Sequence, residues 1–497
     1  MPVQRKSDEG ELVESDGGRL VLRSLAIVIS ARAQRLCVNA KEHMDLKEVR
    51  DNVQILFETD VLVVGGGTAG SVAGIASSRN GADTVVVEQM GFLGGTATGG
   101  LVFPMMPNHV GGRPLCAGIS LEIQRKLAEM GDGGSDPAGN DGWFNPEALK
   151  YVLEELATES GCRLLYHTFA SAPILEGNVV KGAVLETKLG RRAILSRVTV
   201  DATGDADMAV KAGAPYESGR RKDGLSQPMS LRFTMGNVDI PRLVSFLRKI
   251  DPKGEYGLPW LEIWMVPARD SPLEDVFRRA IAARVLDVDD AAYFQAFSVP
   301  GRPREVGFNC PRITGSLKGH NPVDLTEAEI QGRSRIARYV EFLREYFDGF
   351  EDAYLAQTAV MVGVRESRRI VGEYVLTEED HRMRRKFEDA VARNRYPIDI
   401  HLPSGGTELS EPFGSEEYHE IPYRCLVPKE VDGLLVAGRC LSATFEAQAS
   451  VRIQPVVRAL GEAAGTAAAM CAREGTSPRA LDGRRLRDAL VRQGANL

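Results

Sequence analysis

The stretch from Phe57 to Glu88 constrains the fold of this chain more than any other part of its sequence. A short valine-rich run, 60–64, leads directly into a glycine-rich turn at 65–70, and small residues follow it. This order predicts a buried strand, a tight turn and then a helix that can lie close on a sheet. Asn80-Gly81 is a helix stop, and 84–87 is expected to form a second strand.

The turn also has the glycine spacing of a dinucleotide-binding unit. In such a unit Gly65 makes the tight turn, Gly67 lets backbone approach a pyrophosphate, and Gly70 permits close packing of helix on strand. Free N–H groups at the helix start favour negative charge, and Glu88 stands where a carboxylate would hold ribose hydroxyls. We therefore expect a bound dinucleotide, with a purely structural strand–helix–strand corner as the alternative.

Length and charge narrow the class of protein. The chain has 497 residues, which exceeds one ordinary domain, so we expect two. Its formal net charge is −7 and it has no long basic run, which argues against nucleic acid as a partner. The most apolar early stretch, 20–31, contains Arg23 and follows several acids, unlike a secretory signal. We expect a cytoplasmic protein without a membrane span. The sequence leaves open whether the protein forms a homo-oligomer.

The seven cysteines are scattered singly, and no two of them form a CxxC pair. This spacing argues against a disulfide framework, a zinc site and an iron–sulfur cluster. It also argues against a flavoprotein that relays electrons through a paired dithiol. We therefore expect no metal, and mostly buried free thiols.

The first part of the chain has no sustained hydrophobic period. Residues 1–43 mix charges freely and precede Met44, so we expect a disordered extension or an upstream start-codon artefact. Residues 44–56 are expected to form an amphipathic lead-in helix.

After Glu88 comes a loop, GFLGGTATGG at 91–100, that is too rich in glycine for regular structure. The glycine turn, the terminal acid and this loop together resemble FAD-dependent oxidoreductases of the glutathione-reductase-like and fumarate-reductase-like superfamily. The resemblance implies FAD as the cofactor. Relatives that attach FAD covalently carry a histidine in this loop, and none stands between Glu88 and Gly100, so the resemblance implies non-covalent FAD.

Two further segments extend the resemblance. VTVDATGDADMA, at 198–209, is similar to the strand and Ala-Thr-Gly turn that pass near FAD in these flavoproteins. Val431 to Met470 contains LLVAGR and GEAAGTAAA, and its helix, expected to begin near Pro455, would face the flavin edge that gains negative charge on reduction. Together with GVRESRRIVGEY at 363–374, these segments resemble a bacterial group of FAD-dependent oxidoreductases, most of which have no assigned substrate. The resemblance extends over residues 58–475.

The resemblance implies an α/β fold: a Rossmann-like, GR2-type FAD-binding domain made discontinuous by an inserted α+β substrate domain. The expected boundaries are 44–215 and 425–480 for the FAD-binding domain, 216–424 for the substrate domain, and 481–497 for a C-terminal tail. Within the substrate domain the sequence predicts long charged helices at 326–347 and 377–394.

The cofactor-binding residues that the resemblance implies lie on the glycine turn and its acid, the following loop, a strand near 170, the Ala-Thr-Gly turn and the approach to the C-terminal helix. They are Gly65, Gly67, Thr68, Ala69, Gly70, Glu88, Gly94, Gly95, Thr96, Ala170, Ala202, Thr203, Gly204, Asp205, Gly438, Arg439, Ser450, Arg452 and Ile453.

Flavin supplies hydride chemistry, so the protein has to position a substrate and manage a proton. His401 is the candidate acid–base group because its ordinary pKa lies near neutrality; a hydrogen-bonded core histidine is the alternative. Arg365 and Arg368 belong to a charged island between apolar runs, where they would hold a substrate carboxylate or form a salt-bridged domain junction. Tyr423 is a candidate donor to a substrate oxygen.

No second GxGxxG follows a strand, so we expect no dedicated NAD(P)H domain. The electron partner stays open among dioxygen, a quinone, a carrier protein and transiently docked NAD(P)H. We expect a dehydrogenase or reductase that moves a hydride between a small organic substrate and flavin N5. A flavin-dependent monooxygenase and a FAD-binding electron-transfer subunit of a larger complex are the alternatives.

Overall fold

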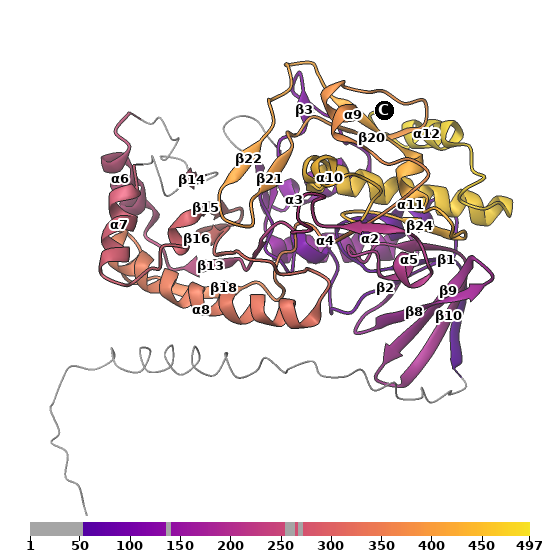
Figure 1. Ribbon diagram of the computed structural model, residues 1–497, viewed down its shortest axis with the longest axis horizontal. Helices are drawn as coiled ribbons and strands as arrows, with labels where there is room; N and C mark the ends of the chain where they lie inside the picture. Colours follow the sequence, from indigo (N-terminus) through magenta and orange to yellow (C-terminus); the bar gives the residue numbers. More distant parts are fainter. Residues whose placement is uncertain (1–52, 136–140, 254–263, 267–271) are drawn as a thin grey trace, which may run out of the picture. The chain divides into compact units, whose positions relative to one another are not determined.

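A sheet with a parallel centre gathers strands that lie far apart in the sequence (Figure 1). The computed structural model describes residues 53–135, 141–253, 264–266 and 272–497. β1 (Gln54–Val64) pairs in parallel with β2 (Thr84–Val87) on one side and with β10 (Gly190–Asp201) on the other. β7 (Arg163–Leu165) extends the sheet beyond β2, again in parallel.

Strand β10 joins two parts of this sheet. Its first half pairs in antiparallel fashion with β9 (Val179–Thr187), which in turn pairs with β8 (Phe169–Glu176). Its last residues pair in parallel with β24 (Leu434–Val436), although residues 202–433 separate the two strands in the chain. Segments from both ends of the described chain therefore build one sheet.

Two helices cross closely beside the sheet. These are α2 (Thr68–Arg79) and α11 (Gln454–Glu474). A Cβ atom at Gly461 would lie 2.2 Å from the carbonyl oxygen of Ala69, and one at Gly465 would lie 2.1 Å from that of Ala73. The glycines of GEAAGTAAA are therefore required by the close approach of the two helices.

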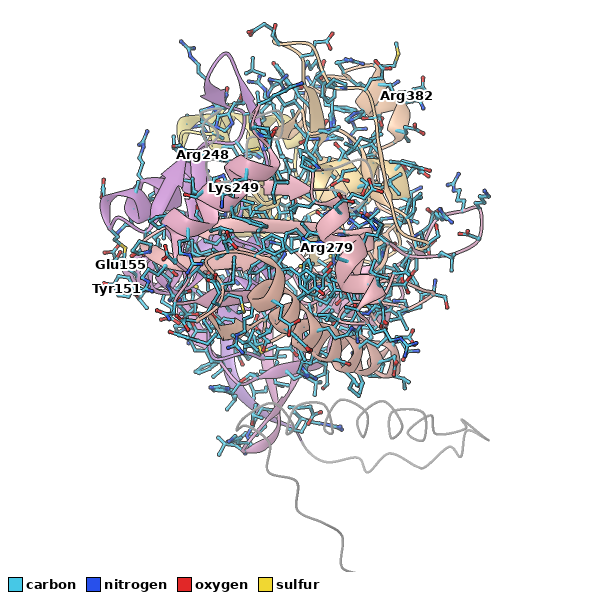
Figure 2. The ribbon with its side chains drawn as sticks, turned by 90° about the vertical axis from the view of Figure 1, so that its left-hand side faces the viewer. Tyr151, Glu155, Arg248, Lys249, Arg279 and Arg382 are labelled. Atoms are coloured by element: carbon cyan, nitrogen blue, oxygen red, sulfur yellow. The ribbon has the colours of Figure 1, made fainter. Side chains whose placement is uncertain are left out.

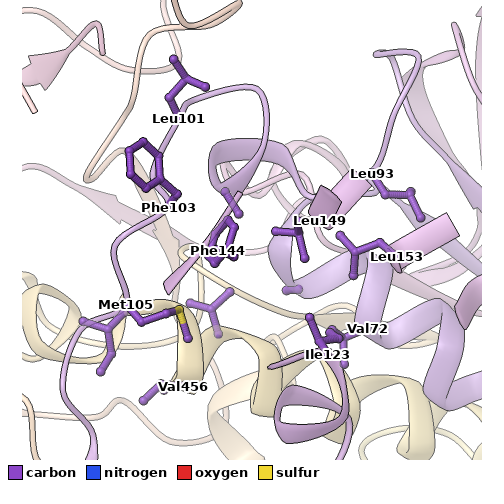
Figure 3. Packing of buried hydrophobic residues seen from close by; sticks show 14 of the residues in the cluster. Val72, Leu93, Leu101, Phe103, Met105, Ile123, Phe144, Leu149, Leu153 and Val456 are labelled. Atoms are coloured by element: carbon purple, nitrogen blue, oxygen red, sulfur yellow. The ribbon is translucent and has the colours of Figure 1, made fainter. Parts of the chain in front are cut away.

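The core beside these helices is made of side chains from several elements. Figure 3 shows Val72 of α2 and Ile123 of α3 (Ile119–Glu129) close to Leu149 and Leu153 of α4 (Pro146–Glu159), and Val456 of α11 beside Met105. Helix α4 starts as its sequence predicts, because the Asn145 side chain accepts a hydrogen bond from the backbone N–H of Glu147 at 3.1 Å. Burial of these aliphatic side chains fixes the helices against one another.

A second sheet is antiparallel throughout, in the order β14 (Trp264–Val266), β15 (Phe294–Val299), β16 (Arg302–Phe308), β13 (Phe233–Gly236) and β18 (Tyr354–Thr358). Helix α8 (Pro322–Tyr346) runs beside β18 (Figure 1). Phe233 and Phe308 stack with ring centroids 4.6 Å apart. Helices α6 (Ile240–Ile250) and α7 (Glu274–Ala282) carry exposed charges, among them Arg248, Lys249 and Arg279 (Figure 2).

Short elements complete the described chain. The remaining helices are α5 (Asp207–Lys211), α9 (Glu378–Arg382), α10 (Phe445–Val451) and α12 (Gly483–Arg492). Two-stranded ladders pair β3 (His109–Val110) with β4 (Arg113–Pro114), β5 (Gly133–Ser135) with β6 (Asp141–Phe144), β11 (Tyr216–Ser218) with β19 (Arg368–Ile370), β12 (Met229–Ser230) with β17 (Arg312–Ile313), β20 (Ala390–Asn394) with β23 (His419–Pro422), and β21 (Asp399–His401) with β22 (Thr407–Leu409). Among the described residues no helix is both long and apolar enough to span a bilayer.

Several predicted elements are confirmed and others are wrong. The strand, helix and strand around the glycine turn, the helix at 326–347 and the helix near Pro455 are all present. The single helix predicted over 377–394 is wrong: α9 ends at Arg382, and 390–394 instead pairs with β23. Tertiary strand pairing here outweighs the helical pattern of the sequence.

The two ends of the chain also differ from prediction where they are described. Residues 54–56 belong to β1 and not to a lead-in helix. The predicted tail contains α12, which buries Leu486 and Leu490. The predicted extension at 1–43 and the rest of the predicted lead-in helix, up to residue 52, lie outside the described residues.

Candidate active site

A cavity of about 770 Å³ is bordered by residues from both sheets. At one end its wall consists of the glycine turn, Glu88 and the Ala-Thr-Gly turn that follows β10. At the other end the wall includes Arg232, Tyr293, Arg365 and His401. The cavity is therefore continuous from the predicted dinucleotide turn to residues of the predicted substrate domain.

Three glycines of the turn meet different steric demands. Gly65 has φ +92°, and a Cβ there would lie 2.7 Å from the Ala202 carbonyl oxygen. A Cβ at Gly70 would lie 1.8 Å from the carbonyl oxygen of Gly65, so the role of this glycine is to let the helix pack closely on the turn. Gly67 borders the cavity, where the nearest atom to an added Cβ is Gly95 Cα at 3.8 Å. The backbone at Gly67 therefore faces open space, as close approach of a pyrophosphate requires.

Glu88 is a buried carboxylate held by backbone donors. Its Oε2 accepts from the N–H of Gly66 at 2.7 Å and its Oε1 from that of Met90 at 2.8 Å. Burial raises the pKa of Glu88, while these hydrogen bonds act in the opposite direction. Each oxygen keeps a second lone pair, so the side chain can still accept hydrogen bonds from ribose hydroxyls at the cavity wall.

The starts of α2 and α11 both border the cavity without a side-chain cap. Gly67 and Ile453 are their N-cap residues, and neither first turn contains an acid. The free N–H groups of a helix start carry partial positive charge and favour an anion. The two starts therefore fit the pyrophosphate and the electron-rich flavin edge of FAD, respectively.

Asp201 fixes the turn at the end of β10. Its Oδ1 accepts from Thr203 N at 3.1 Å and from Thr203 Oγ1 at 2.7 Å, and its Oδ2 accepts from the N–H groups of Met208 and Ala209, both at 2.9 Å. This buried carboxylate therefore orders the turn that borders the cavity. Asp201 itself lies at the end of β10 and was not among the predicted site residues.

An ion pair connects this turn to the one after β24. Arg439 contacts Asp205 Oδ1 at 2.6 Å and donates to the Gly204 carbonyl at 2.9 Å. The two predicted FAD-contacting turns, distant in sequence, are thus held side by side by charge.

Most of the predicted cofactor-binding residues border the cavity, and three do not. Gly70 packs against Gly65, and Gly94 donates its N–H to the Gly66 carbonyl at 2.8 Å, which draws the loop onto the turn. Ser450 is buried and donates to the Tyr396 carbonyl at 2.6 Å. Those at the wall are Gly65, Gly67, Thr68, Ala69, Glu88, Gly95, Thr96, Ala170, Ala202, Thr203, Gly204, Asp205, Gly438, Arg439, Arg452 and Ile453.

His401 borders the cavity, but its hydrogen bonds do not suit a base. Its Nδ1 lies 2.7 Å from a guanidinium nitrogen of Arg312, which can only donate, so Nδ1 is unprotonated and Nε2 carries the proton. Nε2 lies 3.5 Å from Asp399 Oδ2. Burial, followed by the charge of Arg365 and other arginines, holds the pKa of His401 well below its ordinary value. These contacts favour the alternative of a hydrogen-bonded core histidine in its neutral form, and the acid–base role of His401 stays a prediction.

The other predicted catalytic residues divide into one at the cavity and two away from it. Arg365 borders the cavity and donates to the Pro228 carbonyl at 2.6 Å and to Ser230 Oγ at 3.0 Å. Arg368 instead pairs with Asp207 and donates to the Asp205 carbonyl at 2.7 Å. Tyr423 is buried and donates to the Pro478 carbonyl at 2.8 Å. The structure therefore does not bring Arg368 and Tyr423 to the cavity wall, because both side chains serve internal bonds, and their substrate contacts stay predictions.

Sequence reasoning missed several residues at the far end of the cavity. Arg232 and Tyr293 border it, and Arg312 lies behind them, with its guanidinium carbon 3.8 Å from the centroid of the Tyr293 ring. Tyr396 and Asp399 also border it, and the Tyr396 hydroxyl donates to Asp399 Oδ2 at 3.3 Å. An arginine inside the apolar run MSLRFTM was the available signal for Arg232.

Comparison with known proteins agrees with the geometry of the cofactor end. The FAD dependent oxidoreductase family matches residues 60–490. Digeranylgeranylglycerophospholipid reductase 1 of Methanopyrus kandleri is 29% identical over 160 residues, which cover 30% of this chain and 40% of that protein. The corresponding reductase of Methanosphaerula palustris is 28% identical over 156 residues, which cover 30% of this chain and 39% of that protein. The chain thus spans less than half the length of the curated relatives it matches.

Among solved structures, a geranylgeranyl bacteriochlorophyll reductase-like protein from Thermoplasma acidophilum is similar, with a TM-score of 0.42 and 16% identity. The likeness covers 88% of this chain and 84% of that one. The family match extends over most of the sequence, and the glycine turn, Glu88 and the two helix starts fit a dinucleotide. The protein therefore belongs to the FAD dependent oxidoreductase family, and FAD is its cofactor.

Proposed function

We propose that this protein is a dehydrogenase or reductase that binds FAD without a covalent bond and moves a hydride between flavin N5 and a small organic substrate. The continuous cavity carries this proposal, because it has a dinucleotide cradle at one end and buried arginine and tyrosine side chains at the other. FAD supplies the hydride chemistry when bound, and the protein supplies binding, orientation and charge.

In this proposal the cofactor is held by a discontinuous, GR2-type FAD-binding domain at 44–215 and 425–480. The parallel pairing of β24 with β10 supports this division. The turn at 65–70 binds the pyrophosphate and Glu88 binds the ribose. The start of α11 lies against the flavin edge that becomes negative on reduction, where its free N–H groups stabilise that charge.

The substrate in this proposal is oriented by residues of 216–424. The antiparallel sheet and the β21–β22 hairpin supply that wall of the cavity, with Arg365 as a cation and His401 as a neutral donor. Tyr396 keeps its proton, because burial raises its pKa, and its hydroxyl contacts Asp399. These side chains exclude bulk water and set the direction from which a substrate approaches.

Two measurements test the proposal in sequence. Purified protein should be yellow, and acid or heat should release FAD into the supernatant. Flavin absorbance should then bleach anaerobically with one class in a panel of amino acids, hydroxy acids and sugars, or the reduced enzyme should be reoxidised by an enoate. A colourless protein that also takes up no added FAD would contradict the cofactor assignment.

The same material separates the alternatives. NAD(P)H-dependent oxygen consumption with a hydroxylated product would favour a monooxygenase over the proposed function. Co-purification of a stoichiometric partner, with no flavin reduction by any compound of the panel, would favour an electron-transfer subunit. Bleaching in the absence of oxygen and of NAD(P)H distinguishes the proposed reaction from both.

A further inference from the structure

We infer that the substrate is a small organic dianion, in its simplest form a dicarboxylate, bound by an arginine cluster formed by Arg232, Arg312, Arg365 and Arg452. The word substrate rests on the function proposed above, whereas the binding of a dianion can be measured independently. Arg232, Arg365 and Arg452 border the same cavity as the glycine turn.

The members of the arginine cluster come from four separate segments. Arg232 precedes β13, Arg365 precedes β19 and Arg452 is the C-cap residue of α10; all three border the cavity. Arg312, in β17, lies directly behind the cavity wall against Tyr293 and His401. All four raise the local positive potential enough to lower the pKa of His401, after the larger effect of its burial.

The hydrogen bonds of the arginine cluster leave most of its charge without a counterion. Arg232 donates to the Leu101 carbonyl at 3.2 Å, and Arg365 donates to a carbonyl and a hydroxyl. Arg312 donates to the Gly406 carbonyl at 2.8 Å and to His401. The buried Nε atoms of Arg312 and Arg452 have no hydrogen-bond partner among the described residues. These buried cations therefore have fewer hydrogen bonds than their donors allow, and among them Arg232, Arg365 and Arg452 border the cavity that an anion would enter.

Asp399 is the only carboxylate in the described residues that contacts the arginine cluster, at 3.3 Å from Arg452. The other acids of the cavity wall are engaged elsewhere. Asp205 pairs with Arg439, Asp207 with Arg368 and Glu329 with Arg333, while Glu88 binds backbone N–H groups. Four arginines against one carboxylate leave an excess of three positive charges.

Buried positive charge of this size is unfavourable without an anion. Desolvation lowers the pKa of Arg232 to about 10 and that of Arg365 to about 9, so the protonated forms are penalised by their surroundings. An anion in the cavity would restore the ordinary charge balance. The cluster is therefore better explained as a binding site than as a structural network.

A ligand with two anionic groups balances the excess positive charge of the arginine cluster better than a ligand with one. Arg452 directly precedes α11, where bound FAD would be reduced, so one positive charge would be matched by the negative charge of the reduced flavin. Two positive charges then remain for the substrate. Planar carboxylates match the fork of donors on a guanidinium group.

The test uses the FAD-loaded protein and two readouts, calorimetry and the change in flavin absorbance. Malonate, succinate, glutarate and adipate are titrated, with butyrate, dimethyl glutarate and inorganic phosphate as comparisons. At least one dicarboxylate should bind saturably, about 10-fold or more tightly than butyrate, and dimethyl glutarate should not bind. Added salt should weaken binding of the dicarboxylate because the interaction is electrostatic.

Variants connect the binding to the arginine cluster. Arg365→Gln and Arg232→Gln should each weaken dicarboxylate binding by about 10- to 100-fold, and Arg365→Lys should recover part of the loss. Arg278→Gln removes the same charge from an exposed position on α7 and should leave the affinity unchanged. FAD content and melting temperature are measured for each variant, and Arg365→Lys serves as the test if Arg365→Gln does not fold.

Unchanged dicarboxylate affinity in folded Arg365→Gln and Arg232→Gln would overturn the inference, as would equal binding of dimethyl glutarate. Tighter binding of inorganic phosphate than of every dicarboxylate would also overturn it. If an uncharged compound bleaches the flavin with the same kcat/KM in wild type and Arg365→Gln, the inference fails while the proposed function stands. If no FAD binds, the proposed function fails, and calorimetry on the same protein still decides whether the dianion binds.

Discussion

Glu88 illustrates how a single side chain in this fold combines two tasks. Its carboxylate accepts two backbone hydrogen bonds that order the glycine turn, and it borders the cavity where the ribose is proposed to bind. Glu88→Gln would place an NH₂ group against one of these N–H donors and would also remove the charge. We expect FAD affinity to fall by about 10-fold or more, measured by equilibrium dialysis.

The matched control for Glu88 is Glu58→Gln, because Glu58 is exposed on β1. It should leave FAD affinity unchanged. Equal affinity in Glu88→Gln and the control would remove Glu88 from cofactor binding.

His401 is predicted to contribute through geometry and not through titration. Arg312 holds it as a neutral donor, so flavin reduction by substrate should show no inflection near pH 6.5 that belongs to this residue. His401→Phe removes the acceptor for Arg312 and should slow reduction by about 10-fold, whereas His401→Gln, which keeps an acceptor, should slow it less. FAD should remain bound in both variants.

The measurement for His401 is the pH profile of anaerobic flavin reduction. A wild-type inflection near the ordinary histidine pKa that disappears in His401→Gln would support the acid–base role. Rates equal to wild type in both variants would exclude His401 from the mechanism altogether.

Among the elements, the crossing of α2 and α11 determines the cofactor end of the cavity. Gly465 allows contact with the Ala73 carbonyl, and a Cβ at this position would lie 2.1 Å from that oxygen. Gly465→Ala should therefore force the two helices apart and lower the free energy of unfolding by about 1–3 kcal/mol. Because both helix starts border the cavity, FAD affinity should fall as well.

Urea denaturation and FAD titration test this element directly. Ala459→Ser, at a partly exposed position of the same helix, is the control and should change the free energy of unfolding little. A Gly465→Ala protein as stable as wild type would show that the helices can separate without cost.

For the whole molecule, buried histidines make stability depend on pH. His381 and His419 are buried with ring centroids 5.1 Å apart. Desolvation lowers the pKa of His381 to about 4, with a further effect of Arg384 and Arg382. It lowers the pKa of His419 to about 3, with a further effect of His381.

Both histidines favour the neutral form in the folded state, so their contribution is complete above the ordinary pKa of 6.5. As pH falls below 6.5, the unfolded chain takes up protons that the folded chain does not, and stability is lost until the folded pKa is reached. We expect these two histidines together to lower the free energy of unfolding by on the order of 4 kcal/mol between about pH 7 and pH 5, with about half of this from each. Urea titrations at both pH values check this.

His419→Asn provides the comparison. It removes one of the two groups, so the decrease between the two pH values should be smaller than in wild type. An identical decrease in wild type and variant would assign the pH dependence to other groups.

Local patterns predicted the parts of the fold that depend on near neighbours in the sequence. The glycine turn, the Asn145 cap and the start of α11 each follow from a few adjacent residues, because turn geometry and capping are short-range effects. The helix predicted over 377–394 failed for the opposite reason. Residues 390–394 obtain their hydrogen bonds from β23, a partner that no local pattern reveals.

By itself, the sequence determined the strand, the glycine turn and the helix that follows it, and it placed Glu88 at the end of the next strand, because these elements depend on neighbouring residues. Only the tertiary structure decided the far end of the cavity. Arg232, Arg365 and Arg452 from separate segments border it, and Arg312 behind them contacts the nitrogen with which His401 would have acted as a base. Charge balance and protonation depend on distances in space, which sequence spacing does not encode.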